Sequence, residues 1–390
     1  MTEGRQSMAN KTTLISTTIA VLFLAGLAGT MSNAHPKFAV REAVTCVQCH
    51  VNNQGGGLRN EYGANYYSRD VLPAIPWDDF GNENFTTAIN EFIRYGSDVR
   101  MQFYNYSEQN SSQNAFFPMQ ADVYLGVTPS DQFTVYFEQS LFRSIASTDL
   151  WAQWSNSGGN VYVRFGQFFQ DYGLRLDDHT SFIRGGNDGG VVVNENTAQI
   201  PVQFQGLHWK PENNNVGFEA GYNPIGWKIT GSIGKKLGQE TYSTSINASR
   251  AFWIGPANML FGLSYFNGGY YRQLDRYSYY GAYAGLNWGP LTLMGEADLM
   301  RDYPAANATG FTSYADLTWQ IQDGIFLALE QDYFDANRDL ENNELVRYTI
   351  GAELFPISYV EVKPQYRLLN ATASPDFSRS EFILQFHFWF

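Results

Sequence analysis

Cysteine is nearly absent from this chain of 390 residues, which contains only Cys46 and Cys49. A structural zinc site needs four ligands, and the next histidine after His50 is His179, so zinc is disfavoured. A thioredoxin-like dithiol is disfavoured because no βαβ pattern surrounds the two cysteines.

Long apolar runs are also missing, except near the N-terminus. Arg5 and Lys11 precede an apolar run over residues 14–27, and Ser32-Asn33-Ala34 supplies small residues where a signal peptidase cleaves. This pattern predicts a secretory signal over residues 1–34. After the signal, no run approaches the roughly 20 apolar residues that a membrane helix requires.

Basic residues are outnumbered, with 25 Lys and Arg against 38 Asp and Glu, which gives a net charge of −13. This balance argues against nucleic acid as a partner. Aromatic residues, by contrast, make up 16% of the chain. Without a membrane helix, this composition fits either a soluble β-protein or an outer-membrane barrel whose strands alternate lipid-facing and lumen-facing side chains.

From residue 95 onward, the sequence follows the period-two pattern of strands separated by turns. The last strand places Phe382, Leu384, Phe386, Phe388 and Phe390 on one face and Glu381, Gln385 and His387 on the other. Residues 325–332 and 360–368 segregate charged from apolar side chains in the same way. A polar lumen inside a lipid-facing wall requires this arrangement, and an aromatic C-terminal residue is typical of such barrels. We therefore predict an all-β fold, a transmembrane antiparallel β-barrel over residues 95–390, in contact with the lipid bilayer.

The number of strands follows from predicted tight turns, which lie at residues 128–131, 156–159, 211–215, 255–258, 289–290, 322–324 and 355–356. They give about sixteen strands if residues 216–234 form one strand bent at Asn223 and Pro224, with fourteen and eighteen as alternatives. A barrel of this size leaves a lumen. The third outer connection, over residues 170–198, is long and contains paired glycines, so we expect it to fold inward and narrow the pore.

The most specific motif is Cys46-Val47-Gln48-Cys49-His50, the pattern of a c-type haem attachment site. The two thiols can each form a thioether to a haem vinyl group, and His50 is then placed as the proximal axial ligand of the iron. Such haem is attached in an exported compartment, which agrees with the predicted signal. We therefore predict one covalently attached haem c, held by a small N-terminal plug over residues 35–94 that needs walls from the rest of the chain.

The sixth ligand of the haem iron stays open. His179 could serve if the long outer connection enters the lumen, whereas His387 is in phase with the lumen-facing residues near the periplasmic mouth. His35 would require the mature N-terminus to fold back. Met101 or Met119 would give a higher redox potential than a second histidine.

The order of export signal, one C-x-x-C-H motif and a barrel ending in phenylalanine resembles the fused monohaem cytochrome–porins of iron-oxidising bacteria. The residues that carry the local resemblance are Pro36-Lys37-Phe38-Ala39, Leu58, Asn60 and Tyr62-Gly63. Val40 replaces a basic residue of the family, and a Gly-rich segment replaces its short spacer after His50. The resemblance implies the haem roles of Cys46, Cys49 and His50 and leaves the electron donor open.

Two functions follow for an outer-membrane protein. The first is an electron conduit that passes electrons between an extracellular donor or acceptor, with ferrous iron as one candidate, and a periplasmic c-type cytochrome. The second is a passive or substrate-selective porin in which the haem unit is a gate or structural plug. A soluble periplasmic β-protein with a haem sensor is a third interpretation. No Ser-His-Asp constellation, P-loop or dinucleotide fingerprint indicates a hydrolase or transferase.

Overall fold

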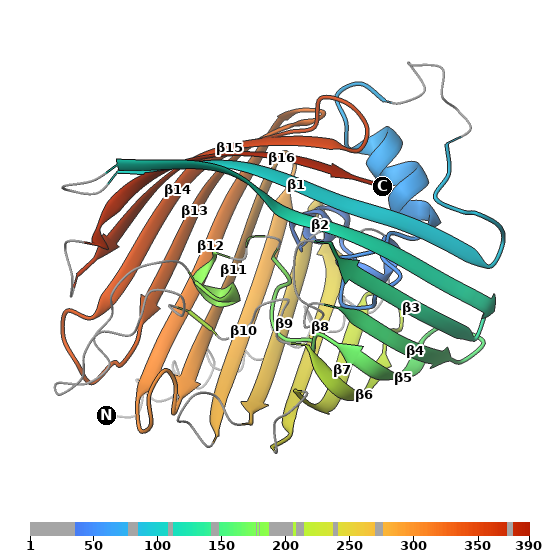
Figure 1. Ribbon diagram of the computed structural model, residues 1–390, viewed down its shortest axis with the longest axis horizontal. Coiled ribbons are helices and arrows are strands. Elements are labelled where there is room, and N and C mark those ends of the chain that lie inside the picture. Colours follow the sequence, from blue (N-terminus) through green and yellow to red (C-terminus); the bar gives the residue numbers. More distant parts are fainter. Residues whose placement is uncertain are drawn as a thin grey trace, which may run out of the picture.

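The computed structural model describes residues 36–76, 85–107, 112–141, 148–176, 178, 180–186, 206–207, 214–236, 241–269, 276–372 and 377–390. These residues form one closed antiparallel barrel, in which each strand pairs with its neighbours along the chain and β1 pairs with β16 (Figure 1). The strands are β1 (Ile93–Ser107), β2 (Ser112–Ser130), β3 (Phe133–Ser140), β4 (Asp149–Ser155), β5 (Val161–Phe168), β6 (Asn215–Tyr222), β7 (Trp227–Lys235), β8 (Ser243–Ile254), β9 (Ala257–Gly268), β10 (Tyr277–Trp288), β11 (Leu291–Arg301), β12 (Thr309–Gln322), β13 (Ile325–Asp335), β14 (Glu344–Leu354), β15 (Val360–Ala371) and β16 (Arg379–Trp389). No helix in these ranges is long and apolar enough to cross a membrane.

The alternation along each strand explains why the barrel has an apolar outside and a polar inside. In β16, Phe382 and Phe388 are exposed on the outer surface, whereas Glu381 and His387 are buried on the lumen side. The same division holds around the wall, where large apolar side chains are exposed and charged side chains are buried. The predicted all-β barrel with sixteen strands and a charged inner face is therefore confirmed.

One of the predicted turns is wrong. β5 pairs directly with β6, so the third outer connection continues from Phe168 to Asn215, and no tight turn at 211–215 joins two wall strands. The tight turn lies instead at residues 223–226, where Gly226 has a positive φ of 72° and β6 and β7 meet as a hairpin. The expected single bent strand is thus two strands. The total of sixteen is correct because these two errors cancel.

The N-terminal segment (residues 36–76) lies partly inside the barrel and partly at the mouth where the C-terminus ends (Figure 1). It contains helix α2 (Pro36–Glu42), a short 3-10 turn η1 (Cys46–Gln48) and a π-helix η2 (Gly63–Val71). Val40 of α2 is fully buried and lies so close to β10 that a Cβ at Gly285 would collide with it. On η2, Ser68 accepts a hydrogen bond of 3.0 Å from the indole of Trp389 on β16.

The third outer connection folds into the lumen, as predicted. We call its described part (residues 169–176, 178 and 180–186) the inward loop; it includes the 3-10 turn η5 (Phe182–Arg184). Asp171 accepts a hydrogen bond of 3.0 Å from Lys228 on β7, and Asp178 forms an ion pair of 2.6 Å with Arg367 on β15. The loop therefore crosses from one side of the inner wall to the other. Burial opposes the ionisation of Asp178, but Arg367 and Arg347 outweigh it and hold the pKa of this carboxyl well below its usual range.

Charged side chains of the inner wall form buried ion pairs, and one of them anchors the N-terminal segment. Arg164 on β5 is fully buried, lies 2.9 Å from Glu219 on β6 and donates a hydrogen bond of 2.9 Å to the side chain of Asn52. The guanidinium also stacks on Trp151 and Phe168. Removing one partner of such a pair leaves the other charge buried without compensation.

We expect Arg164→Met to lower the free energy of unfolding by about 3 kcal/mol, because Glu219 then loses its cation. Urea titration in detergent, followed by heat-modifiable gel mobility, measures this loss. The double variant Arg164→Met/Glu219→Met should recover most of the stability, since no unpaired charge remains. A single variant as stable as the wild type would show that the pair is not coupled to folding.

Candidate functional site

The two cysteines and His50 are held together by a tight local backbone. The amides of Cys49 and His50 donate hydrogen bonds of 3.2 and 3.1 Å to the carbonyl of Cys46. The side chain of Asn60 donates to the carbonyls of Val47 and Gln48, at 3.1 and 2.8 Å. These bonds satisfy the carbonyls of the turn and fix the relative positions of both thiols and the imidazole.

Two further contacts of residues 60–63 require the residue types found there. The amide of Asn60 donates to the carbonyl of Cys49 at 2.8 Å, and its side-chain oxygen accepts from the amide of Gly63 at 3.0 Å. A Cβ at Gly63 would collide with the Cys49 carbonyl, so only glycine allows this close approach. Asn60 and Gly63 therefore hold the backbone of the motif at Cys49 in place.

The Gly-rich segment after His50 is a docking hairpin. His50 and Arg59 form an antiparallel bridge, and the amide of Val51 donates to the carbonyl of Leu58 at 3.0 Å. The tip of the hairpin contacts the inner wall, where Gln54 donates to Glu219 at 2.9 Å and the amide of Leu58 donates to the hydroxyl of Tyr136 at 3.2 Å. The sequence indicated only a Gly-rich segment here, whereas these contacts position the motif.

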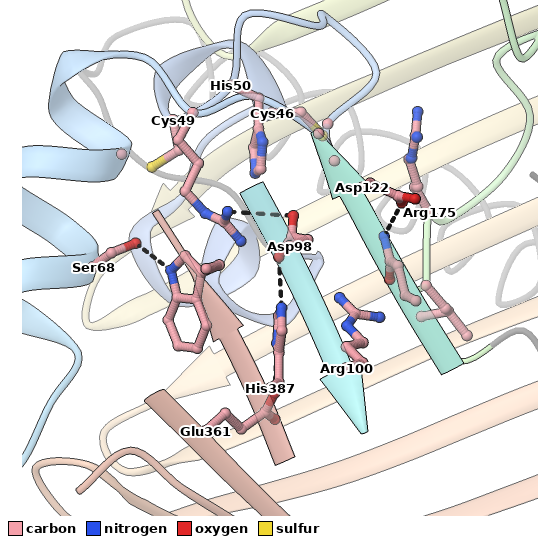
Figure 2. Close-up of a pocket in the computed structure, with 18 of the residues that line it drawn as sticks. Cys46, Cys49, His50, Ser68, Asp98, Arg100, Asp122, Arg175, Glu361 and His387 are labelled. Carbon is pink, nitrogen blue, oxygen red and sulfur yellow. Dashed lines mark hydrogen bonds and ion pairs between the residues drawn. The ribbon is translucent and has the colours of Figure 1, made fainter. Parts of the chain in front are cut away.

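The motif faces a large cavity of about 1590 Å³, its openings included. Figure 2 shows Cys46, Cys49 and His50 on one side of it, with the His50 ring directed toward the strands that carry Asp98 and His387. Three parts of the chain line the cavity: the N-terminal segment, strands β1–β3 and β14–β16, and the inward loop through Phe169, Arg175, Leu176 and Arg184. The motif therefore borders a space that the N-terminal segment, the wall and the inward loop enclose together.

The charges around the cavity are mixed. The basic side chains that line it are Arg59, Arg100, Arg175 and Arg184, and the acidic ones are Asp98, Asp122, Glu138, Glu353 and Glu361. Arg59 forms an ion pair of 3.6 Å with Asp98 and stacks on the ring of Trp389. One buried guanidinium nitrogen of Arg175, Nη1, has no hydrogen-bond partner in the described residues. Arginines placed in this way can bind carboxylates such as the propionates of a haem.

His387 lies on the cavity wall, but carboxylates occupy both of its ring nitrogens. Nδ1 lies 3.0 Å from Glu361 and Nε2 lies 2.5 Å from Asp98. Both ring nitrogens are therefore engaged by side chains of the wall in this arrangement. A role as an iron ligand would require one of these bonds to break.

The other sixth-ligand candidates fall into two groups. Met119 on β2 lines the same cavity as the motif, whereas Met101 on β1 is not among the described residues that line it. His35 and His179 lie outside the described residues. Within the described ranges, no group of three or more His, Cys, Asp or Glu side chains is placed to hold a bare metal ion.

These residues fit the predicted haem. Two thiols and one imidazole border a single cavity, and arginines and a methionine line the same space. Burial raises the pKa of the Cys46 thiol, and the charge of Lys228 offsets only part of this effect. The thiol of the protein without cofactor is therefore mainly protonated at neutral pH.

Sequence reasoning singled out the motif and His387 but missed the other residues around the cavity. Arg175 was seen only as part of a long connection, yet a Cβ at Gly56 would lie 2.8 Å from its guanidinium. Asp98 was not singled out, and Glu361 was one of several charges on the predicted lumen face of residues 360–368. Their register offered a signal, because Asp98 pairs with Trp389 and Glu361 with His387 across the β1–β16–β15 ladder.

Comparison with known proteins gives the fold but no family: no family model and no curated protein matches this chain. OprB of Pseudomonas putida is similar in structure, with a TM-score of 0.59 and 9% identity over 82% of this chain and 99% of that chain. OmpF of Salmonella typhi and a loop-deleted OmpT of Vibrio cholerae each give a TM-score of 0.51, at 10% and 11% identity, over 76% of this chain and 97% and 99% of theirs.

The fold is therefore that of the outer-membrane porins, and identities this low show the fold alone. Its apolar outer surface and charged inner surface are those of a bilayer-spanning barrel, which agrees with the predicted outer-membrane location. The resemblance to cytochrome–porins rests on the residues around the motif and stays a prediction.

The raised pKa of Cys46 gives a prediction for protein produced without haem. Because the thiolate is the reactive form, alkylation of Cys46 at pH 7.5 should be slower than that of a free cysteine and should rise to a plateau at higher pH. Mass spectrometry of the reduced protein after timed alkylation measures this profile. Protein unfolded in urea serves as the control, and equal rates in folded and unfolded protein would contradict the prediction.

Proposed function

We propose that this protein is an outer-membrane electron conduit, a porin-type barrel that carries one c-type haem inside its lumen. Electrons would pass between an extracellular redox substrate and a periplasmic c-type cytochrome. The observation that carries the proposal is that Cys46, Cys49 and His50 face one large cavity enclosed by the barrel wall and the inward loop.

The physical reason for such an arrangement lies in the membrane. Lipid hydrocarbon is an insulator about 30 Å thick, and a closed barrel provides a protein wall through it. The motif lies toward the mouth that contains both the N-terminal segment and the C-terminus. Short turns and chain ends of such barrels face the periplasm, so the cavity would be nearer to the periplasmic partner.

Each residue of the site has a role in this proposal. Cys46 and Cys49 would hold the haem covalently, and His50 would be its proximal axial ligand. Arg175 offers an unpaired buried nitrogen and would bind a propionate. Met119 is the described side chain of ligand type in the cavity whose donor atom is not held by carboxylates, so it is our candidate for the sixth position. When bound, the haem would supply a one-electron redox centre.

A liposome experiment tests the conduit. Purified protein is inserted into liposomes loaded with an oxidised soluble c-type cytochrome, and an impermeant ferrous complex is added outside. We expect the trapped cytochrome to become reduced, followed by its absorbance, and this reduction to be lost in Cys46→Ala and His50→Ala protein. The reduction should be lost because Cys46→Ala removes one covalent attachment of the haem and His50→Ala removes its axial ligand.

Val47→Ala is the matched control, because it alters the same turn and leaves both cysteines and His50 in place. Heat-modifiable gel mobility verifies that every variant still forms the barrel. If Cys46→Ala protein passes electrons as fast as the wild type, or if the wild type binds no haem, the conduit function is wrong.

The second candidate function is a channel for small solutes in which the N-terminal segment is a gate or structural plug. The shared fold with OprB and with the outer-membrane channel DcaP of Acinetobacter baumannii, which has a TM-score of 0.50, favours it. The charged inner wall is also typical of a water-filled barrel.

Solute entry separates the channel from the conduit. Liposome swelling in arabinose measures permeation through the full-length protein. For a conduit, whose lumen holds both the N-terminal segment and the inward loop, we expect swelling close to that of empty liposomes. Rapid swelling, with no reduction of trapped cytochrome, would replace the conduit by the channel.

A further inference from the structure

A group of buried aromatic rings extends from the cavity toward the opposite mouth of the barrel. We call it the aromatic series; its members are Phe169, Tyr172, Phe266, Tyr277, Tyr279 and Tyr303. The ring centroids of Tyr172 and Tyr279 are 6.1 Å apart, and those of Tyr279 and Tyr303 are 5.3 Å apart. Phe266 stacks on Tyr279 at 5.6 Å. These separations are those of aromatic rings in direct contact.

The inner end of the series lies at the cavity. Phe169 of the inward loop lines the cavity that the motif faces, and it also contacts the buried cluster that contains Tyr172. Leu176 belongs both to the cavity lining and to the same cluster. The series and the cavity are therefore continuous.

The outer end of the series lies under a loop on the other side of the membrane. Tyr303 is in the connection between β11 and β12, on the side opposite the short turns, and its hydroxyl donates to the carbonyl of Gly206 at 2.7 Å. Asp302, the preceding residue, is exposed, and so is Ala306 in the same connection. An external one-electron donor at the exposed Asp302 would thus be next to Tyr303, the outermost ring of the series.

These rings are not the aromatic girdle that faces lipid. Tyr279 and Tyr303 are fully buried inside the barrel, whereas Tyr280, the next residue of β10, is 42% exposed on the outer face. Tyr280 contacts Tyr265 with centroids 5.2 Å apart, so the outer face offers an equivalent ring pair with no connection to the cavity.

We propose that the aromatic series is the route by which electrons cross from the extracellular mouth to the cavity; this inference rests on the proposed conduit function. One electron would leave the external donor and reduce the ferric iron held by His50 to ferrous iron. The rings would serve as a densely packed tunnelling medium, with no change in their oxidation state and no proton transfer. Electronic coupling falls less steeply through atoms in contact than across a water-filled gap, and the series provides such contact.

The route explains how one haem could serve a membrane whose hydrocarbon core is about 30 Å thick. A haem in the cavity lies toward one mouth, so a donor at the other mouth needs an intervening path. The described rings supply ring-to-ring contact from Tyr172 to Tyr303 by way of Tyr279, and Phe169 packs against this cluster at the cavity end.

The test compares haem reduction from the outside in matched variants. Haem-loaded protein in liposomes is mixed with the impermeant donor ferrous-EDTA, and haem absorbance is followed by stopped flow. We expect Tyr279→Leu to slow this reduction several-fold, because it removes the ring that contacts both Tyr172 and Tyr303 directly and leaves only the longer path through Phe266 and Tyr277. The haem spectrum, its midpoint potential and its reduction by a membrane-permeant reductant should be unchanged.

Three further variants make the result specific. Tyr280→Leu removes the neighbouring lipid-facing ring, and the haem of this variant should be reduced at the wild-type rate. Tyr279→Phe keeps the ring without the hydroxyl and should also match the wild type, because no proton moves. Tyr303→Leu tests the outer end independently and should slow the reaction if Tyr279→Leu does not fold.

The outcomes separate this inference from the conduit function. If the wild type is reduced from outside and Tyr279→Leu and Tyr303→Leu match it, the route is wrong and the conduit stands. A slower rate accompanied by a shifted midpoint potential would also overturn the route, because the rings would then act through the haem environment. If the wild-type haem is not reduced from outside, both proposals fail together.

Discussion

The constraint on which the structure depends is that lipid hydrocarbon offers no hydrogen-bond partner to a backbone amide. The chain meets it by pairing β1 with β16, so that the sheet has no free edge. Closure then divides the side chains into two environments. Apolar groups face lipid, and charged groups on the inner face form buried ion pairs such as Arg164–Glu219 and Arg347–Asp332.

The N-terminal segment depends on this interior because it is too short to build a core of its own. Its helix α2 rests on β9, β10 and β11, its hairpin binds Arg164 and Tyr136, and η2 is tied to Trp389. The cavity in front of Cys46 and His50 is therefore a joint product of the segment, the wall and the inward loop. A substitution far away in sequence, such as one at Arg164, can change the geometry around the motif.

Local patterns in the sequence were sufficient for the fold class, the strand faces and the motif, because alternation and turn chemistry act over a few residues. They failed at 211–215, where Pro211 and three asparagines have the composition of a tight turn, because β5 pairs directly with β6 and the wall turns at residues 223–226 instead. The cavity could not be predicted, since Arg175 and Trp389 reach it through contacts with residues more than a hundred positions away. The haem, its sixth ligand and the electron partners stay predictions.

The enclosure of the N-terminal segment has a consequence for biogenesis. The segment precedes β1 in the chain, yet the finished wall surrounds it on several sides. An enzyme that attaches a cofactor to Cys46 and Cys49 is itself a folded protein and would not fit inside the closed barrel to reach these thiols. Cofactor attachment would therefore have to precede the pairing of β1 with β16. The barrel would then close around an N-terminal segment that already carries its cofactor.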